Sequence, residues 1–196
     1  MKKIIIFASG SGSNAERIAT YFQQKGTAQV SLILCNNPQA GVLTRAKRLA
    51  IPSLVFNRQA FYESDIVLNV LKSQHPDLIV LAGFLWKVPA YLTEAYPHKI
   101  INIHPSLIPS FCGKGYYGIH VHEAALKRGV KITGATVHYV DEDLDTGPII
   151  LQKAVEVREE DTPQILQKRV MEEAEHIILP EAINMIAAAL KKQEEV

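Results

Sequence analysis

Short apolar stretches alternate with longer amphipathic ones from the first residue to about position 140. The apolar stretches have the length of strands, and they lie at 4–8, 29–35, 53–56, 78–82 and 100–104. Between them, apolar side chains recur three and four positions apart, as on a helix with one buried face, at 14–25, 42–50 and 59–73. This alternation is typical of β-α units built around a mostly parallel sheet.

The pattern changes after Pro105. Residues 105–118 hold two prolines and three glycines and show no periodicity, and so long a loop favours a functional role. The later pattern predicts a helix at 119–127, strands at 132–140 and 149–157 joined by the acidic turn 141–148, and a final helix opened by Thr162-Pro163. Pro180 is expected to kink or split that final helix.

These elements predict an α/β fold class with a doubly wound, mostly parallel, Rossmann-like sheet and an antiparallel C-terminal portion. A chain of 196 residues with 47% hydrophobic and 21% charged residues fits one globular domain, 1–196. The 21 basic and 20 acidic residues give a net charge of +1, which argues against binding to nucleic acid or to a membrane surface. Any anion must therefore be bound locally.

Cysteine usage and apolar run length indicate where the protein works. Cys35 and Cys112 are too few for a disulfide framework, which fits a reducing compartment. The longest apolar runs have the length of strands and fall short of the roughly 20 residues that cross a bilayer. The start of the chain also lacks the pattern of a signal peptide. We therefore expect a soluble, cytoplasmic protein.

A glycine-rich turn, 9–15, lies between the first predicted strand and the first predicted helix. Backbone N–H groups and the helix dipole favour a phosphate there, and Ser11, Ser13 and Asn14 can add side-chain hydrogen bonds. A dinucleotide site would also want an acidic residue near the end of the second strand, but none occurs between Glu16 and Glu63. A phosphate ester of mononucleotide size is the preferred ligand, and a tight turn that binds nothing remains the alternative.

Polar residues with catalytic potential follow the fifth strand. Asn102 and His104 lie two positions apart, so alternation places both on one face at the carboxyl edge of the sheet, where such sheets bind ligands. An amide donor and an imidazole could stabilise an oxyanion and move a proton. Asp145 in the acidic turn is expected to raise the pKa of the imidazole and fix its tautomer.

Metal binding is not favoured by the histidine spacing. His120, His122 and His138 form no metal-binding motif, and the acidic turn has Thr146 and Gln152 where a calcium loop needs glycine and glutamate. We therefore expect no metal.

Four motifs in this order carry a resemblance to a known family. They are Gly-Ser-Gly-Ser-Asn at 10–14, Leu-Ala-Gly-Phe at 81–84, Asn-Ile-His-Pro-Ser-Leu-Ile-Pro at 102–109, and Val-His-Tyr-Val with the later Leu-Asp-Thr-Gly-Pro within 137–148. Over nearly its whole length the chain resembles the folate-dependent formyltransferases. With 196 residues, we expect the chain to lack the extra domains that the longer members of that family carry.

The resemblance implies the activity and its substrates. It implies transfer of the formyl group of 10-formyltetrahydrofolate, as cosubstrate, to the amine of 5'-phosphoribosylglycinamide in purine biosynthesis. Another formyltetrahydrofolate-dependent formyltransferase or hydrolase is the alternative, followed by a nicotinamide-dependent oxidoreductase. A phosphate-binding half, about 1–104, would precede a folate and catalytic-loop half with the C-terminal helix, about 105–196.

The resemblance also implies roles for individual residues. The catalytic residues would be Asn102, His104 and Asp145. Residues expected at the ribonucleotide are Ser11, Gly12, Ser13, Asn14, Ala15, Gly83, Pro105 and Glu175. Residues expected at the folate are Arg58, Leu85, Trp86, Lys87, Val88, Asn102, Val140, Asp141 and Asp145.

Three features depart from the common pattern of the family. The segment 111–118 is longer than usual, Trp86 stands where arginine is often found, and the helix before Glu175 is one residue longer.

Overall fold

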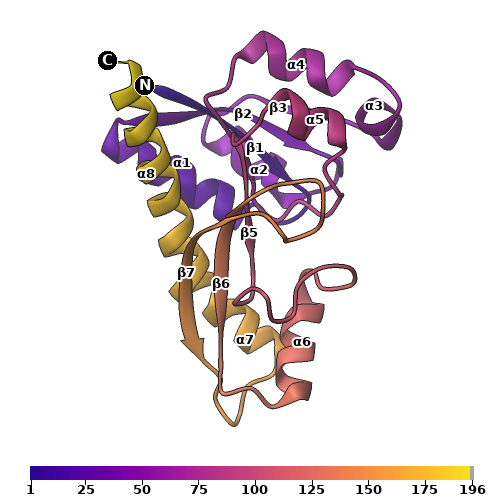
Figure 1. The fold of residues 1–196 in the computed structure, drawn as a ribbon, viewed down its shortest axis with the longest axis vertical. Coiled ribbons are helices and arrows are strands. Elements are labelled where there is room, and N and C mark those ends of the chain that lie inside the picture. Colours follow the sequence, from indigo (N-terminus) through magenta and orange to yellow (C-terminus); the bar gives the residue numbers. More distant parts are fainter. Residues whose placement is uncertain (195–196) are drawn as a thin grey trace.

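The computed structural model describes residues 1–194, with side chains to residue 192, and Figure 1 shows its arrangement. Within these residues the strands form one seven-stranded sheet in the order β3-β2-β1-β4-β5-β6-β7. The strands are β1 (Lys2–Ala8), β2 (Ala28–Cys35), β3 (Ser53–Val55), β4 (Leu78–Leu81), β5 (Ile100–His104), β6 (Ile132–Tyr139) and β7 (Ile149–Glu156). The first five are parallel, and β6 and β7 are antiparallel to their neighbours, as predicted. One sheet thus runs through both expected halves, and residues 195–196 of the expected domain lie outside the described residues.

The helices cover both faces of this sheet. They are α1 (Ser13–Lys25), α2 (Gly41–Arg48), α3 (Arg58–Tyr62), α4 (Ile66–Gln74), α5 (Ala90–Ala95), α6 (Ile119–Arg128), α7 (Pro163–Val170), the π-helix η1 (Met171–Glu175) and α8 (His176–Glu194). None of the helices among the described residues is long and apolar enough to span a membrane.

The stretch predicted as one helix at 59–73 is two helices, α3 and α4. Asn57 caps α3 by accepting a hydrogen bond from the Ala60 N–H at 2.9 Å, and α3 already ends at Tyr62. The apolar spacing runs across the break, so periodicity alone joined the two helices. Helix α5 was not predicted, because its six residues offer too few turns for a period to show.

The final helix also differs from the prediction. Helix α8 continues through Pro180, so the expectation of a split there was wrong. A proline inside a helix leaves the carbonyl four positions earlier without its N–H partner, and here that carbonyl, of His176, accepts a hydrogen bond from Arg17 Nε at 3.0 Å. The irregularity lies earlier, in the π-turn η1, where the hydrogen bonds span one more residue than in an α-helix.

Strand β1 is buried on both faces, which explains its unbroken apolar sequence. Ile4, Ile6 and Ala8 pack into one core, together with residues of α1, α2, α6, α7, η1 and α8. Ile5 and Phe7 pack into a second core on the opposite face, together with residues of α3, α4 and α5. Near-continuous apolar strands are typical of a parallel sheet covered on both faces. The polar chemistry is therefore found where the strands end.

The turn after β1 depends on glycine at position 12. Gly12 is the N-cap of α1 with φ of 79°, a left-handed conformation that favours glycine. A Cβ there would lie 2.5 Å from Val42 Cγ2 and 2.7 Å from Val42 Cα. The hydrogen bond from Val42 N–H to the Gly10 carbonyl, 3.1 Å, holds the two segments at this close approach.

We expect Gly12→Ala to lower the free energy of unfolding by about 2–4 kcal/mol, because it adds left-handed strain and a clash with the backbone of α2. Urea unfolding followed by circular dichroism measures the change. Gly10→Ala is the matched control, since an added Cβ there meets nothing within 4 Å and its φ is not positive. Equal stability of the two variants would contradict this account of the turn.

Candidate active site

A cavity of about 510 Å³ opens where β1, β4 and β5 end. Its lining comes from the glycine-rich turn after β1, the segment after β4, the end of β5, the loop before α6, the loop between β6 and β7, and the helices α7 and η1. Figure 1 shows the β6–β7 loop, in orange, reaching back over the carboxyl end of the parallel strands. Strand β6 ends beside the start of β5, with Tyr139 opposite Ile101, so the loop folds back along β5 to line the cavity with the strand ends.

His104 lies at the end of β5, buried and between two partners. Its Nε2 donates a hydrogen bond to the Phe111 carbonyl at 2.8 Å, since a carbonyl can only accept. Its Nδ1 lies 3.6 Å from Asp145 Oδ2, which is longer than a hydrogen bond. The neutral ring is therefore fixed with its proton on Nε2, and Nδ1 is left as the nitrogen that can take up a proton.

Two opposing effects set the pKa of His104. Burial lowers the pKa of His104 below its usual value, although the charge of Asp145 and the bond to Phe111 raise it in part. Asp145 thus acts in the expected direction, but the desolvation of the ring outweighs the attraction of this one carboxylate. His104 is therefore mostly neutral at neutral pH.

Asp145 is held as a carboxylate. Burial alone would raise its pKa, but the His138 and His104 side chains and the Gly113 N–H together bring it below the usual value. The Gly113 N–H donates to Oδ2 at 2.8 Å. Asp145 has a φ of 60°, so the loop backbone turns sharply to aim this carboxylate inward.

His138 is a site residue to which the sequence reasoning gave no role, although it lies in the motif Val-His-Tyr-Val and was considered as a metal ligand. It pairs with Asn102 across the β5–β6 ladder, and its Nδ1 donates to the Tyr139 carbonyl at 2.8 Å. Its Nε2 must then accept the hydrogen bond from Asn102 Nδ2, at 3.1 Å, since an amide nitrogen can only donate. This bond fixes the orientation of the Asn102 amide. The signal that could have found His138 is its position on the predicted strand 132–140, three positions before the acidic turn that carries Asp145.

A buried hydrogen-bond network fixes the turn that supplies the Phe111 carbonyl. Thr136 Oγ1 donates to the Ser106 carbonyl at 2.7 Å and accepts from the Ile108 N–H at 3.1 Å. Ser106 Oγ donates to the Ser110 carbonyl at 2.5 Å. Both hydroxyl side chains are fully buried, so the network holds the partner of His104 without help from solvent.

The glycine-rich turn forms another wall of the cavity, with Ser11, Gly12, Ser13 and Asn14 in its lining. Asn14 Nδ2 donates to Glu175 Oε2 at 2.6 Å, and Ser13 Oγ lies 3.2 Å from the Met171 sulfur. Burial raises the pKa of Glu175, and the Asn14 bond opposes this in part.

The other expected ribonucleotide residues divide into two groups. Gly83, Pro105 and Glu175 line the cavity, whereas Ala15 packs in the core behind the turn. Sequence reasoning missed three polar side chains of α7 that line the cavity, Gln164, Gln167 and Lys168. The sequence analysis predicted only uncharged side-chain donors for a phosphate, whereas Lys168 adds a cationic side chain to the cavity lining.

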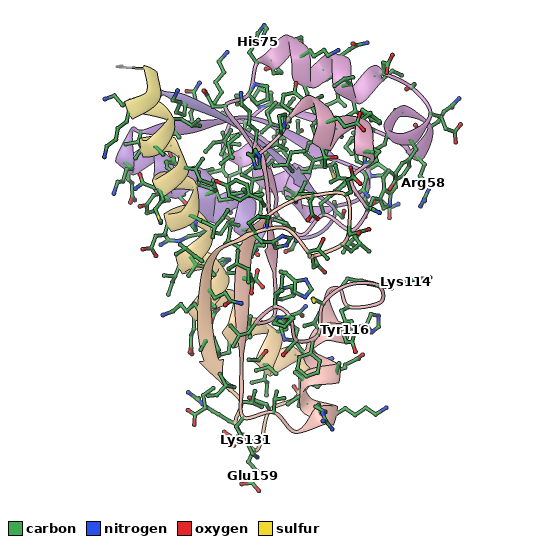
Figure 2. The ribbon with its side chains drawn as sticks, viewed as in Figure 1. Arg58, His75, Lys114, Tyr116, Lys131 and Glu159 are labelled. Carbon is green, nitrogen blue, oxygen red and sulfur yellow. The ribbon has the colours of Figure 1, made fainter. Side chains whose placement is uncertain are left out.

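The residues expected at the folate lie along a further part of the lining. Leu85, Trp86, Lys87, Val88, Asn102, Val140, Asp141 and Asp145 all line the cavity. Arg58 does not. Its guanidinium stacks on the rings of Tyr62, at 5.4 Å, and Trp86, at 5.2 Å, and Figure 2 shows it at the outer edge of the upper half of the molecule.

The long loop 111–118 also reaches the cavity, through Gly113, Gly115, Tyr116, Tyr117 and Gly118. Figure 2 shows Lys114 and Tyr116 on this loop, next to α6. Within the described residues, no group of three or more histidine, cysteine, aspartate or glutamate side chains could hold a metal ion.

Comparisons with known proteins point to one family. A family model described as formyl transferase matches residues 2–183. The chain is 41% identical to phosphoribosylglycinamide formyltransferase of Bacillus subtilis (strain 168), over the whole of both chains. It is 39% identical to the chloroplastic phosphoribosylglycinamide formyltransferase of Arabidopsis thaliana, over 99% of this chain and 68% of that protein. The crystal structure of phosphoribosylglycinamide formyltransferase from Anaplasma phagocytophilum matches with a TM-score of 0.88 and 40% identity, over 95% of this chain and 87% of that one.

We expect Asp145→Asn to lower the pKa of His104 further, because the carboxylate charge is the largest influence that raises it. NMR titration of the histidine side chains measures the shift. The wild-type ring should titrate below the ordinary value of 6.5, and the variant ring at a lower pH still. A His104 pKa that rises or stays constant in Asp145→Asn would contradict the electrostatic coupling of the pair.

Proposed function

The chain belongs to the formyl transferase family, and we propose that it transfers the formyl group of 10-formyltetrahydrofolate to the amine of 5'-phosphoribosylglycinamide. The product is 5'-phosphoribosyl-N-formylglycinamide, an intermediate of purine biosynthesis. One observation carries the proposal: a single cavity joins a phosphate-binding type of turn to Asn102, His104 and Asp145. Two small molecules bound at the two ends of that cavity would meet at these three side chains.

We assign the ribonucleotide to the end formed by the turn 11–14. The N-terminus of α1 attracts the phosphate through its free N–H groups and its dipole, and the serine hydroxyls add donors. Lys168 supplies a positive charge from the neighbouring helix. Asn14 and Glu175 offer a buried amide and carboxyl that suit the ribose hydroxyls.

We assign the folate to the end formed by 85–88 and 140–145. This end combines apolar side chains for a flat ring system with backbone and carboxylate acceptors for its ring N–H groups. Arg58, held on two aromatic faces outside the cavity, suits the carboxylates of the folate tail. Trp86 thus supports Arg58 while it also lines the cavity, at the position where relatives often have arginine.

The reaction follows from these assignments. The amine of the ribonucleotide attacks the formyl carbon, a C–N bond forms, and negative charge develops on the formyl oxygen. The amide N–H of Asn102 that is not bonded to His138 donates to that oxygen. His104 Nδ1 takes the proton that the amine loses. The bond between the formyl carbon and the folate nitrogen then breaks, and that nitrogen receives the proton.

Asp145 makes this proton transfer favourable. The ring of His104 is buried and neutral at rest, and it becomes an imidazolium only when it has accepted the amine proton. The carboxylate 3.6 Å away stabilises this charge, and the imidazolium in turn stabilises the oxyanion. No covalent intermediate with the enzyme is needed.

The division into a phosphate-binding half and a folate half becomes approximate in this proposal, because Glu175 and Lys168 of the second half serve the ribonucleotide. The free thiols of Cys35 and Cys112 support a reducing, cytoplasmic location.

Purified protein should form tetrahydrofolate from 10-formyltetrahydrofolate only when 5'-phosphoribosylglycinamide is present, as followed by absorbance. His104→Ala should lower kcat about a hundredfold to ten-thousandfold, because the proton acceptor is lost. Asn102→Ala should lower it about a hundredfold to a thousandfold, because one oxyanion donor is lost. The control is Lys127→Ala, an exposed side chain in the last turn of α6 that does not line the cavity.

Release of formate without the ribonucleotide would instead indicate a hydrolase. Tetrahydrofolate formation that is indifferent to the ribonucleotide would overturn the proposal, as would full activity of His104→Ala.

His138 should act as a positioning residue for Asn102. His138→Leu removes the acceptor that orients the amide, so we expect kcat to fall at least tenfold while the KM for the ribonucleotide changes little. His138→Gln keeps an acceptor oxygen and should recover part of the loss. Steady-state kinetics of both variants, with thermal unfolding alongside, test this. If both variants lose thermal stability and have the same kcat, His138 would have a packing role only.

A further inference from the structure

His122 is the histidine that the reaction described above leaves unused. It lies in the first turns of α6, is 1% exposed, and its ring lines the cavity. Neither ring nitrogen has a hydrogen-bond partner in the part of the chain that the structure describes. Buried polar side chains almost always have such partners, so two unpartnered nitrogens on one ring at a cavity wall call for a ligand.

The other histidines near the cavity differ in this respect. His104 and His138 bond to backbone carbonyls, and His120, on the same helix, pairs with Glu123. Burial, with the charge of His104 as a second cause, lowers the pKa of His122 to about 4. At neutral pH the ring is therefore uncharged, with one N–H donor and one acceptor nitrogen.

The position of His122 selects one end of the cavity. Helix α6 packs against α7, and α7 leads directly into Met171, which contacts Ser13 of the glycine-rich turn. His122 is close enough to His104 for the charge of one to affect the other. The ring thus lies near His104. Helix α6 packs against α7, which leads to the glycine-rich turn that we assign to the ribonucleotide.

We propose that His122 binds the glycinamide amide of the ribonucleotide and thereby directs its amine toward His104. This inference rests on the proposed function. A neutral imidazole suits a secondary amide, because its ring N–H can donate to the amide carbonyl or its acceptor nitrogen can accept from the amide N–H. The two ring nitrogens point apart, so one amide bonds to one of them, and this bond fixes the tautomer and thus affects both nitrogens. The phosphate, in contrast, calls for cations and helix N–H groups, which the other end of the cavity supplies.

His122→Leu tests the proposal by isothermal titration with 5'-phosphoribosylglycinamide in the absence of folate. We expect the Kd for the ribonucleotide to rise at least tenfold and the Kd for 10-formyltetrahydrofolate to stay the same. Thermal stability should be kept or increased, because two unpartnered polar atoms leave the interior. Lys127→Ala, at an exposed position of the same helix, should match the wild type in all three measurements.

A second measurement needs no variant. In wild-type protein with ¹⁵N-labelled histidine, the ribonucleotide should shift both ring nitrogens of His122, whereas ribose 5-phosphate, which lacks the amide, should leave them in place. Equal shifts with the two compounds would overturn the inference, as would an unchanged ribonucleotide Kd in His122→Leu. Failure of the wild-type protein to bind the ribonucleotide would overturn the proposed function, and this inference with it.

Discussion

The site depends on a reversal of strand direction between β5 and β6. Because β6 runs antiparallel to β5, its last residues lie beside the start of β5, and His138 lies directly opposite Asn102. The loop that follows then carries Asp145 to within 3.6 Å of both His104 and His138. The reversal of strand direction and the loop after β6 thus bring the side chains of Asn102, His104, His138 and Asp145 together.

Burial sets the charge state of that group. The interior disfavours an imidazolium, so the His104 ring rests neutral although a carboxylate lies beside it. The carboxylate has its own support in the Gly113 N–H and the neighbouring rings. Such a pair suits a reaction in which charge appears and disappears, because the ring gains a stabilised charge only after it accepts a proton. A histidine held permanently charged would be a poor acceptor for the amine proton.

The layered architecture was predictable from the sequence, because the strands are buried on both faces and therefore consist of continuous apolar runs. It also predicted that Asn102 and His104 share a face, since alternation along one strand is a local property. The break between α3 and α4 escaped prediction, because the apolar spacing continues across residues 63–65, whereas the chain there leaves the helix and the Ile66 N–H bonds locally to Ser64 Oγ at 3.4 Å. The Asn102–His138 bond and the isolation of the His122 nitrogens depend on the register between distant strands and on how α6 packs. Neither leaves a periodic trace in the sequence.

The π-turn η1 sets the position of Glu175 relative to Arg169. Before this turn, Arg169 is anchored by both guanidinium nitrogens to Asp161 and by one of them to the Glu156 carbonyl. After it, Glu175 is bound to Asn14 at the ribonucleotide wall. In a regular α-helix, one additional residue would rotate Glu175 by about 100° relative to Arg169. A π-turn takes up one additional residue within a single turn, so both anchors keep their partners. The carboxyl group that faces the cavity is therefore placed by its bond to Asn14, and the helix geometry adapts to it.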